Sequence, residues 1–276
     1  MSEASRPIDF AALLAVEDAG GNAFTARLHD FGEGRSFGGD VLGRVALAAR
    51  RTCEPGRRLV SFYGLFLRPG PTDRPVRIEV ERVKDGRLLA QRRARMLDGD
   101  RLVADLTASF AIAGQGPGWS SVAAPDVPAP ETLPTDEERA REEGEAWRPG
   151  EIEWRFVDRV FLDTSSASSR WRAWARPREP LPEDAALHEA ALAYLSDFIS
   201  HGSVLRMLGE RFAWERFASL DQGLWVHRPV RWNDWFLVES ESDVAAEGHT
   251  FTRRRVFDSA GGLLASGSQE GIHPDL

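Results

Sequence analysis

The sequence has almost no cysteine. Cys53 is the only one among 276 residues, which excludes an intramolecular disulfide and a zinc site built on several cysteines. Disulfides are typical of oxidising compartments and rare in the cytosol. The cysteine content therefore fits a reducing compartment, and we expect a cytoplasmic location.

The chain also lacks an excess of basic charge and any long apolar run. Its 35 basic and 43 acidic residues give a formal net charge of −8, which argues against binding nucleic acid or anionic lipid through bulk charge. No stretch approaches the about 18 apolar residues of a membrane-spanning helix, and no secretory signal is recognisable at the N-terminus. We expect neither a nucleic-acid nor a membrane partner.

Nucleotide-binding motifs are missing as well. The sequence contains no P-loop and no dinucleotide-binding glycine fingerprint, so nucleotide-driven chemistry is not indicated. Hydrophobic residues make up 42% of the chain and charged residues 28%, which is ordinary for a folded globular protein.

Residues 114–150 differ in composition from the rest of the chain. Six prolines exclude a continuous helix or a central strand there: Pro117, Pro125, Pro128, Pro130, Pro134 and Pro149. We expect a short charged helix over 136–145, and the remainder is typical of a linker. The sequence therefore predicts an N-terminal unit over 1–113 and a C-terminal unit over 151–276.

The two predicted units resemble each other. Three pairs of segments correspond in order, two of them 160 positions apart and the third 161: 65–69 with 225–229, 93–98 with 253–258, and 102–104 with 263–265. Three matches in order at a nearly constant offset indicate a duplicated unit. Two copies fit a fused dimer better than a solenoid, which needs at least three repeats.

Each unit shows one long helix followed by strands. In the first unit, apolar spacing predicts a helix over 38–51 and strands over 59–67, 76–84, 88–97 and 101–112. In the second unit, it predicts a helix over 185–199 and strands over 219–226, 235–244, 249–258 and 263–272. The second helix is apolar all round and must be covered by the sheet. The expected fold class is α+β.

Five segments carry a family resemblance: 37–39 (FGG), 66–70 (FLRPG), 195–197 (LSD), 224–229 (LWVHRP) and 268–271 (SQEG). They resemble the type II acyl-CoA thioesterases in nearly the whole chain outside the linker and the extreme N-terminus. The resemblance implies a double hot-dog fold, in which each unit wraps a sheet around a long helix. It also implies hydrolysis of acyl-CoA to free acid and coenzyme A, without a metal or an organic cofactor.

The resemblance implies three catalytic residues. The family's aspartate corresponds to Asp197 and its glutamine to Gln269, while its threonine falls on Ser219, which keeps a hydroxyl. These residue types suit a mechanism in which they orient one water, with Asp197 as general base or electrostatic orienter. Asp221 lies close enough in sequence to be an alternative to Ser219.

Further residues are candidates for binding substrate. Gly38 and Gly39 open the first helix, where backbone N–H groups can stabilise an oxyanion, and Asp40 stands where the family often has glutamine, so its charge bears on substrate choice. Several arginines suit the phosphates of coenzyme A or, equally, a solvated helix face: Arg44, Arg50, Arg51, Arg57 and Arg58.

Two other functions remain open from the sequence. A hot-dog hydratase or dehydratase uses an aspartate and a histidine, and Asp197 and His201 are four residues apart, on one helix face. A non-catalytic acyl-CoA binder or sensor keeps the pocket without the water-orienting set. The expected partners are an acyl-CoA substrate and further copies of the chain, because hot-dog sheets often pair edge to edge.

Overall fold

The computed structural model describes residues 9–32, 34, 36–114, 116–143, 150–158, 168–198, 200–208 and 216–273. The described strands form one twelve-stranded antiparallel sheet. They are β1 (Glu17–Gly20), β2 (Ala23–Ala26), β3 (Arg57–Phe66), β4 (Val76–Asp85), β5 (Leu89–Asp98), β6 (Arg101–Ile112), β7 (Ile152–Phe156), β8 (Trp171–Pro177), β9 (Ala218–Val226), β10 (Phe236–Ala246), β11 (His249–Phe257) and β12 (Leu263–Ile272).

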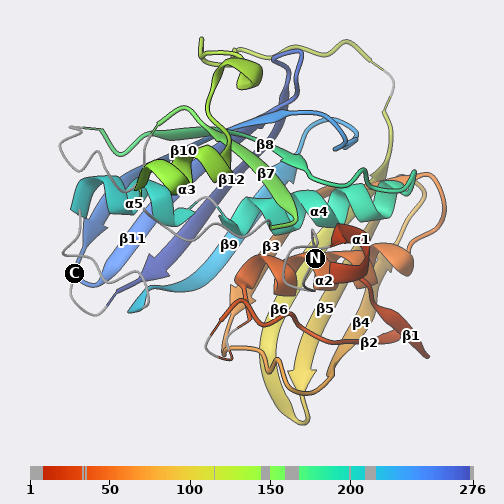
Figure 1. The fold of residues 1–276 in the computed structure, drawn as a ribbon. Helices are drawn as coiled ribbons and strands as arrows, with labels where there is room; N and C mark the ends of the chain where they lie inside the picture. The colour runs from red at the N-terminus through yellow and green to blue at the C-terminus, as the bar shows by residue number, and fades with distance from the viewer. Residues whose placement is uncertain are drawn as a thin grey trace.

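The strand order is the same outward from both sides of the centre. From β3 the order runs β6, β5, β4, β2, and from β9 it runs β12, β11, β10, β8. The two halves join where β3 pairs antiparallel with β9, with Ser61 opposite Trp225 and Leu65 opposite Asp221. Figure 1 shows the result as two groups of strands in one curved sheet. The internal resemblance of the sequence thus corresponds to a repeated strand order.

The described helices are α1 (Phe10–Leu13), α2 (Gly38–Arg51), α3 (Asp136–Glu143), α4 (Ala185–Phe198) and α5 (Ser200–Leu208), with a short 3₁₀ turn, η2, at Pro130–Thr132. Helices α2 and α4 pack side by side over one face of the sheet (Figure 1). Every residue of α4 from Leu187 to Asp197 is buried. This position explains why α4 is apolar all round: one side meets α2 and the other meets the sheet.

The predicted elements are confirmed, with bounds shifted by two residues or fewer. The exceptions concern the ends of two helices: residues 144, 145 and 199 lie outside the described residues. The short elements α1, β1 and β2 were not predicted from the sequence, and neither were β7, β8 and α5. None of the described helices is both long and apolar enough to cross a membrane.

The segment after β6 packs on the second half of the chain. Trp174 Nε1 of β8 donates a hydrogen bond to the Pro128 carbonyl at 3.0 Å, and Arg178 pairs with Asp136 at the start of α3. Contacts of this kind hold an extended, proline-rich stretch against a strand without requiring regular structure within it.

Candidate active site

Asp197 lies in the last turn of α4 and is only 1% exposed. The carboxylate fits there because α2 begins with glycine: a Cβ on Gly38 would lie 2.5 Å from Asp197 Oδ2. The Gly39 backbone N–H donates a hydrogen bond to the carboxylate. A negative charge at a helix N-terminus is favourable, so the start of α2 stabilises the ionised form of Asp197.

Gln269 and Ser219 meet Asp197 from two neighbouring strands. Gln269 Nε2, on β12, donates to Asp197 Oδ1 at 2.7 Å and to Ser219 Oγ, on β9, at 2.6 Å. Ser219 Oγ lies 3.5 Å from Asp197 Oδ1. The structure therefore brings together all three residues that the resemblance indicated, from three separate elements.

The charge state of Asp197 depends on opposing effects. Burial raises the pKa of its carboxyl group, whereas the positive charge of Arg254 and hydrogen bonds from Gln269, Gly39 and Ser219 lower it. Arg254 is itself buried and donates to the Gln269 side-chain oxygen. This arginine was not predicted as a site residue, although the first copy has an alanine, Ala94, at the corresponding position. That difference between the copies is the sequence signal that points to it.

Asp221, the alternative to Ser219, faces away from the site. The pairing of β9 with β12 contains a bulge, because Ser219 is opposite Gly271 and Asp221 is opposite Glu270. The extra residue on β9 turns Asp221 to the other face of the sheet, where its carboxylate accepts a hydrogen bond from the Tyr63 hydroxyl at 2.8 Å. Simple alternation along the strand does not reveal this reversal.

The helix start does not present its groups as we expected. The Gly39 N–H donates a hydrogen bond to Asp197. It is therefore not free to bind an oxyanion, which is the role we expected from the sequence. Asp40 is fully buried, pairs with Arg44 at 2.6 Å and accepts a hydrogen bond from the His29 N–H. Its charge is neutralised inside the protein, so repulsion of an anionic substrate by Asp40 is not supported.

The arginines considered for coenzyme A phosphates have separate partners. Arg50 pairs with Glu189 at 3.2 Å, and Arg51 and Arg58 donate to the carbonyls of Val16 and Val226. Arg57 is 7% exposed and donates to the Gly86 carbonyl. The structure does not gather them into one phosphate cradle, so this role stays a prediction for them.

Other buried polar residues around Asp197 were also missed. Ser196, its neighbour on α4, accepts a hydrogen bond from Gln222, and the Tyr194 hydroxyl donates to Glu151. Both pairs are buried and surround the last turn of α4 with fixed polar groups. The side chain of His201, which the hydratase alternative requires, lies outside the described residues.

A serine-hydrolase spacing was overlooked in the sequence. Residues 34–38 read GRSFG, which matches Gly-x-Ser-x-Gly. A nucleophile elbow connects a strand directly to a helix, but β2 ends at Ala26, well before Ser36. Ser36 Oγ accepts a hydrogen bond from the Gly70 N–H. This serine fastens the loop before α2, and its surroundings do not favour a nucleophile.

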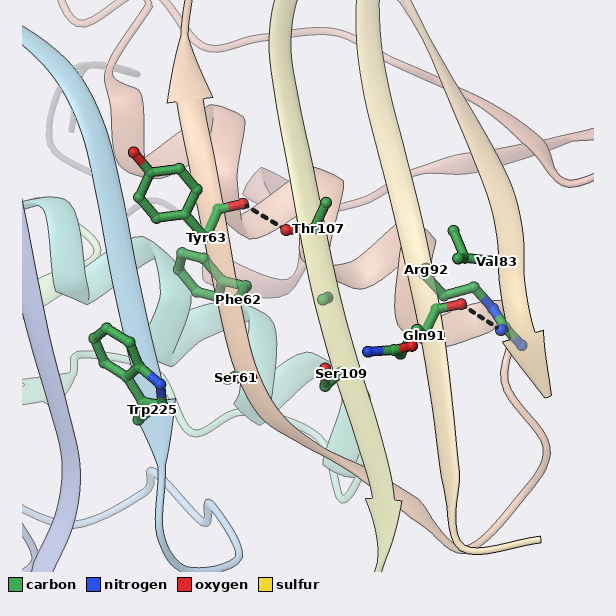
Figure 2. A pocket seen from close by; sticks show the side chains of 10 residues that line it. Ser61, Phe62, Tyr63, Val83, Gln91, Arg92, Thr107, Ser109 and Trp225 are labelled. Carbon is green, nitrogen blue, oxygen red and sulfur yellow. Dashed lines mark hydrogen bonds between the residues drawn. The ribbon is translucent and has the colours of Figure 1, made fainter. Parts of the chain in front are cut away.

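The pocket drawn in Figure 2 lies apart from the three side chains around Asp197. Figure 2 shows a pocket over β3, β5 and β6, lined by Tyr63, Gln91, Thr107 and Trp225 among others. Asp197, Ser219 and Gln269 are not among its lining residues. Among the described residues, no group of three or more His, Cys, Asp or Glu side chains is placed to hold a metal ion.

The fold defines an α+β hot-dog protein. The chain has a TM-score of 0.80 with a hot-dog protein from Alicyclobacillus acidocaldarius, at 19% identity and covering 96% of this chain and 97% of that one. A family model of the acyl-CoA thioesterase N-terminal domain matches residues 27–111, and one of the C-terminal domain matches 124–273. The chain belongs to the acyl-CoA thioesterase family.

Individual relatives agree with this assignment. An acyl-CoA thioesterase II from Mycobacterium marinum is 32% identical, with a TM-score of 0.78 and coverage of 96% of this chain and 98% of that one. Acyl-CoA thioesterase 2 of Haemophilus influenzae is 28% identical over 274 residues, which cover 94% of this chain and 95% of the relative. The protein is a thioesterase that hydrolyses acyl-CoA, which decides against the hydratase and the non-catalytic binder.

Proposed function

We propose that this thioesterase uses one water molecule, held by Asp197, Ser219 and Gln269, to attack the thioester carbonyl. The observation that supports the proposal is the meeting of the three side chains around Asp197 Oδ1. Asp197 is 1% exposed and Gln269 is also 1% exposed. Polar groups buried in this way form strong, well-oriented hydrogen bonds.

The three side chains have different parts in the proposal. Asp197 is the general base, because an ionised carboxylate accepts protons and has no proton to donate. Gln269 donates its two Nε2 hydrogens to Asp197 and Ser219, which fixes the two oxygens that hold the water. Ser219 combines an acceptor with a rotatable O–H donor, so it relays the hydrogen-bond network between Gln269 and Asp197.

The proposed reaction balances without a cofactor. The water loses a proton to Asp197 while its oxygen bonds to the thioester carbon, and the carbonyl electron pair moves onto the carbonyl oxygen. When this intermediate collapses, the C–S bond breaks and the proton held by Asp197 goes to the departing coenzyme A thiolate. No covalent acyl-enzyme is required.

The substrate and the setting of the enzyme are part of the same proposal. The relatives are acyl-CoA thioesterases by name, and we propose as substrate a small-molecule thioester of coenzyme A, with no metal or organic cofactor. The cytoplasmic location and the homo-oligomeric state stay predictions.

Free-thiol release from a panel of acyl-CoA esters tests the mechanism. We expect Asp197→Asn and Gln269→Ala to lower kcat by roughly 100-fold or more, the usual effect of removing a general base or its aligning partner. Asp221→Asn is the matched control, because Asp221 lies on the outer face of β9, and it should retain wild-type turnover. Turnover near the wild-type level in Asp197→Asn would refute the proposed mechanism.

A further inference from the structure

Arg254 is an unusual residue for the interior of this sheet. It lies on β11, is 2% exposed, and donates from Nη2 to the side-chain oxygen of Gln269. Its Nε and Nη1 have no hydrogen-bond partner within the described part of the chain. Burying a guanidinium whose donors are left unpaired is unfavourable for folding. Hydrogen-bond satisfaction therefore does not explain this arginine.

Arg254 determines which way the Gln269 amide points. A guanidinium has only donors, so the amide atom facing it must be the acceptor Oε1. Nε2 then necessarily faces Asp197 and Ser219, to which it donates. Without the arginine, the two orientations of the amide would be closer in energy, and the reversed orientation would place Oε1 against the Asp197 carboxylate.

The duplication provides an internal comparison. The correspondence of 93–98 with 253–258 places Ala94 at the position of Arg254, and the strand register agrees: Ala94 is opposite Leu106, and Arg254 is opposite Gly267. A Cβ on Gly267 would lie 3.1 Å from Arg254 Cγ. The first copy thus places the small Ala94 opposite the large Leu106. The second copy places the large Arg254 opposite Gly267, whose missing side chain leaves room for the arginine.

The same comparison connects the arginine with the polar set. At the offsets of the repeat, the first copy has Leu59 where the second has Ser219, and Ala108 where the second has Gln269. Both residues of the first copy are buried and apolar. The arginine therefore occurs in the copy that carries the polar set, whereas the copy without the set has an alanine.

We propose that Arg254 is a positioning residue of the thioesterase, which fixes Gln269 with Nε2 toward Asp197 and Ser219 and whose positive charge favours the ionised form of Asp197. This inference rests on the proposed function of Asp197, Ser219 and Gln269. Arg254 acts through these residues and touches neither the water nor the substrate.

The electrostatic part of the inference has a definite sign. Burial raises the pKa of Asp197, and the charge of Arg254 is the largest opposing effect. Burial also lowers the pKa of Arg254 to about 10, which leaves it protonated at neutral pH. Removing its charge should therefore raise the pKa of Asp197 and shift the acidic limb of the kcat profile to higher pH.

Other ionisable groups near Asp197 do not replace this charge. On α4, burial keeps the pKa of Tyr194 well above its ordinary value, so it is neutral. On α2, Asp40 is negative when ionised and is paired with Arg44. The carboxylates of Asp221 and Glu270 lie on the outer face of β9 and β12. Arg254 is thus the cation that faces Asp197 in the described structure.

The test compares Arg254→Met, which removes the charge and keeps an unbranched apolar chain, with Arg254→Lys, which keeps a charge without the planar fork. Arg255→Met is the matched control, because Arg255 is an exposed arginine on the same strand that pairs with Glu239. For each variant, kcat and KM are measured from pH 5 to 10, and the urea midpoint is measured at pH 7.

We expect Arg254→Met to lower kcat at pH 7 by at least about tenfold and to move the acidic limb up by about one pH unit. Its KM should stay within about twofold of the wild-type value, and its urea midpoint should not fall below about half the wild-type value. Arg254→Lys should keep the acidic limb in place and still lose turnover, and it also serves as the reporter if Arg254→Met does not fold. Arg255→Met should behave like wild type.

The opposite results are equally clear. An unshifted acidic limb with kcat within about twofold of wild type in Arg254→Met would overturn the inference, and so would a shifted limb in Arg255→Met. If Arg254→Met does not fold, wild-type turnover in Arg254→Lys overturns it. Wild-type turnover in Asp197→Asn, in contrast, would overturn the underlying mechanism whatever the arginine variants show.

Discussion

At the scale of single residues, the site depends on where each hydrogen bond can point. Gln269 is held on one side by Arg254 and on the other by Asp197 and Ser219. Each of these contacts uses a different atom or direction, so the set has a single arrangement of donors and acceptors. The sequence predicted the three residues through a family resemblance but not the arginine that orients them.

Variants of Ser219 test whether turnover needs the hydroxyl group at this position. Ser219→Ala removes the acceptor of one Gln269 hydrogen bond, and we expect kcat to fall by roughly 10- to 100-fold, since a lost buried hydrogen bond costs about 1–3 kcal/mol. Ser219→Thr keeps the hydroxyl, restricts its rotamers and matches the residue that the resemblance implies, so its kcat should equal or exceed wild type. Equal turnover in Ser219→Ala and wild type would show that the hydroxyl has no part in the reaction.

At the scale of elements, regular periodicity decided what was predictable. Helix α2 (Gly38–Arg51) and strand β12 (Leu263–Ile272) were predicted with their observed bounds. In α2, apolar residues recur at the helical spacing, and β12 is supported by the internal repeat of the sequence. Strands β1 and β2 have four residues each, too few for a period to emerge. The bulge that reverses Asp221 depends on pairing between distant strands, which sequence periodicity does not contain.

The contact between α2 and α4 includes an ion pair between the partly exposed Arg50 and the buried Glu189. Burial raises the pKa of Glu189 from 4.5 to about 7, against the opposing charge of Arg50. The folded protein therefore holds this proton more tightly than the unfolded chain does. It follows that stability from this group is fully present below about pH 4.5 and is lost as the pH rises to about 7.

Glu189→Gln should remove this pH dependence. The free energy of unfolding of wild type, relative to Glu189→Gln, should fall by at most about 3 kcal/mol between pH 4.5 and pH 7, as measured by urea unfolding at several pH values. Glu183→Gln serves as control, because the Glu183 side chain is 83% exposed. A difference between wild type and Glu189→Gln that stays constant over this range would contradict the raised pKa.

At the scale of the whole molecule, the two halves share one sheet and one helix layer. β3 pairs with β9 at the centre, and α2 packs against α4 across the same junction. The site itself spans the junction, because the first half supplies the glycines that receive Asp197 and the second supplies the carboxylate, the hydroxyl and the amide. The internal sequence repeat predicted the duplication, but which faces the copies bury against each other is a property of packing.

This shared structure predicts that the halves unfold together. All nine tryptophans come after residue 113, so tryptophan fluorescence reports directly on the second half, whereas far-ultraviolet circular dichroism reports on both. We expect the two signals to coincide during urea unfolding.

A variant in the first half gives a more stringent test of this coupling. Leu47 on α2 is 1% exposed, and Leu47→Ala should cost about 2–5 kcal/mol of unfolding free energy. Because the junction couples the halves, this change should lower the midpoint of the fluorescence signal as much as that of the dichroism signal. A fluorescence midpoint that stays at the wild-type value would show that the halves unfold independently.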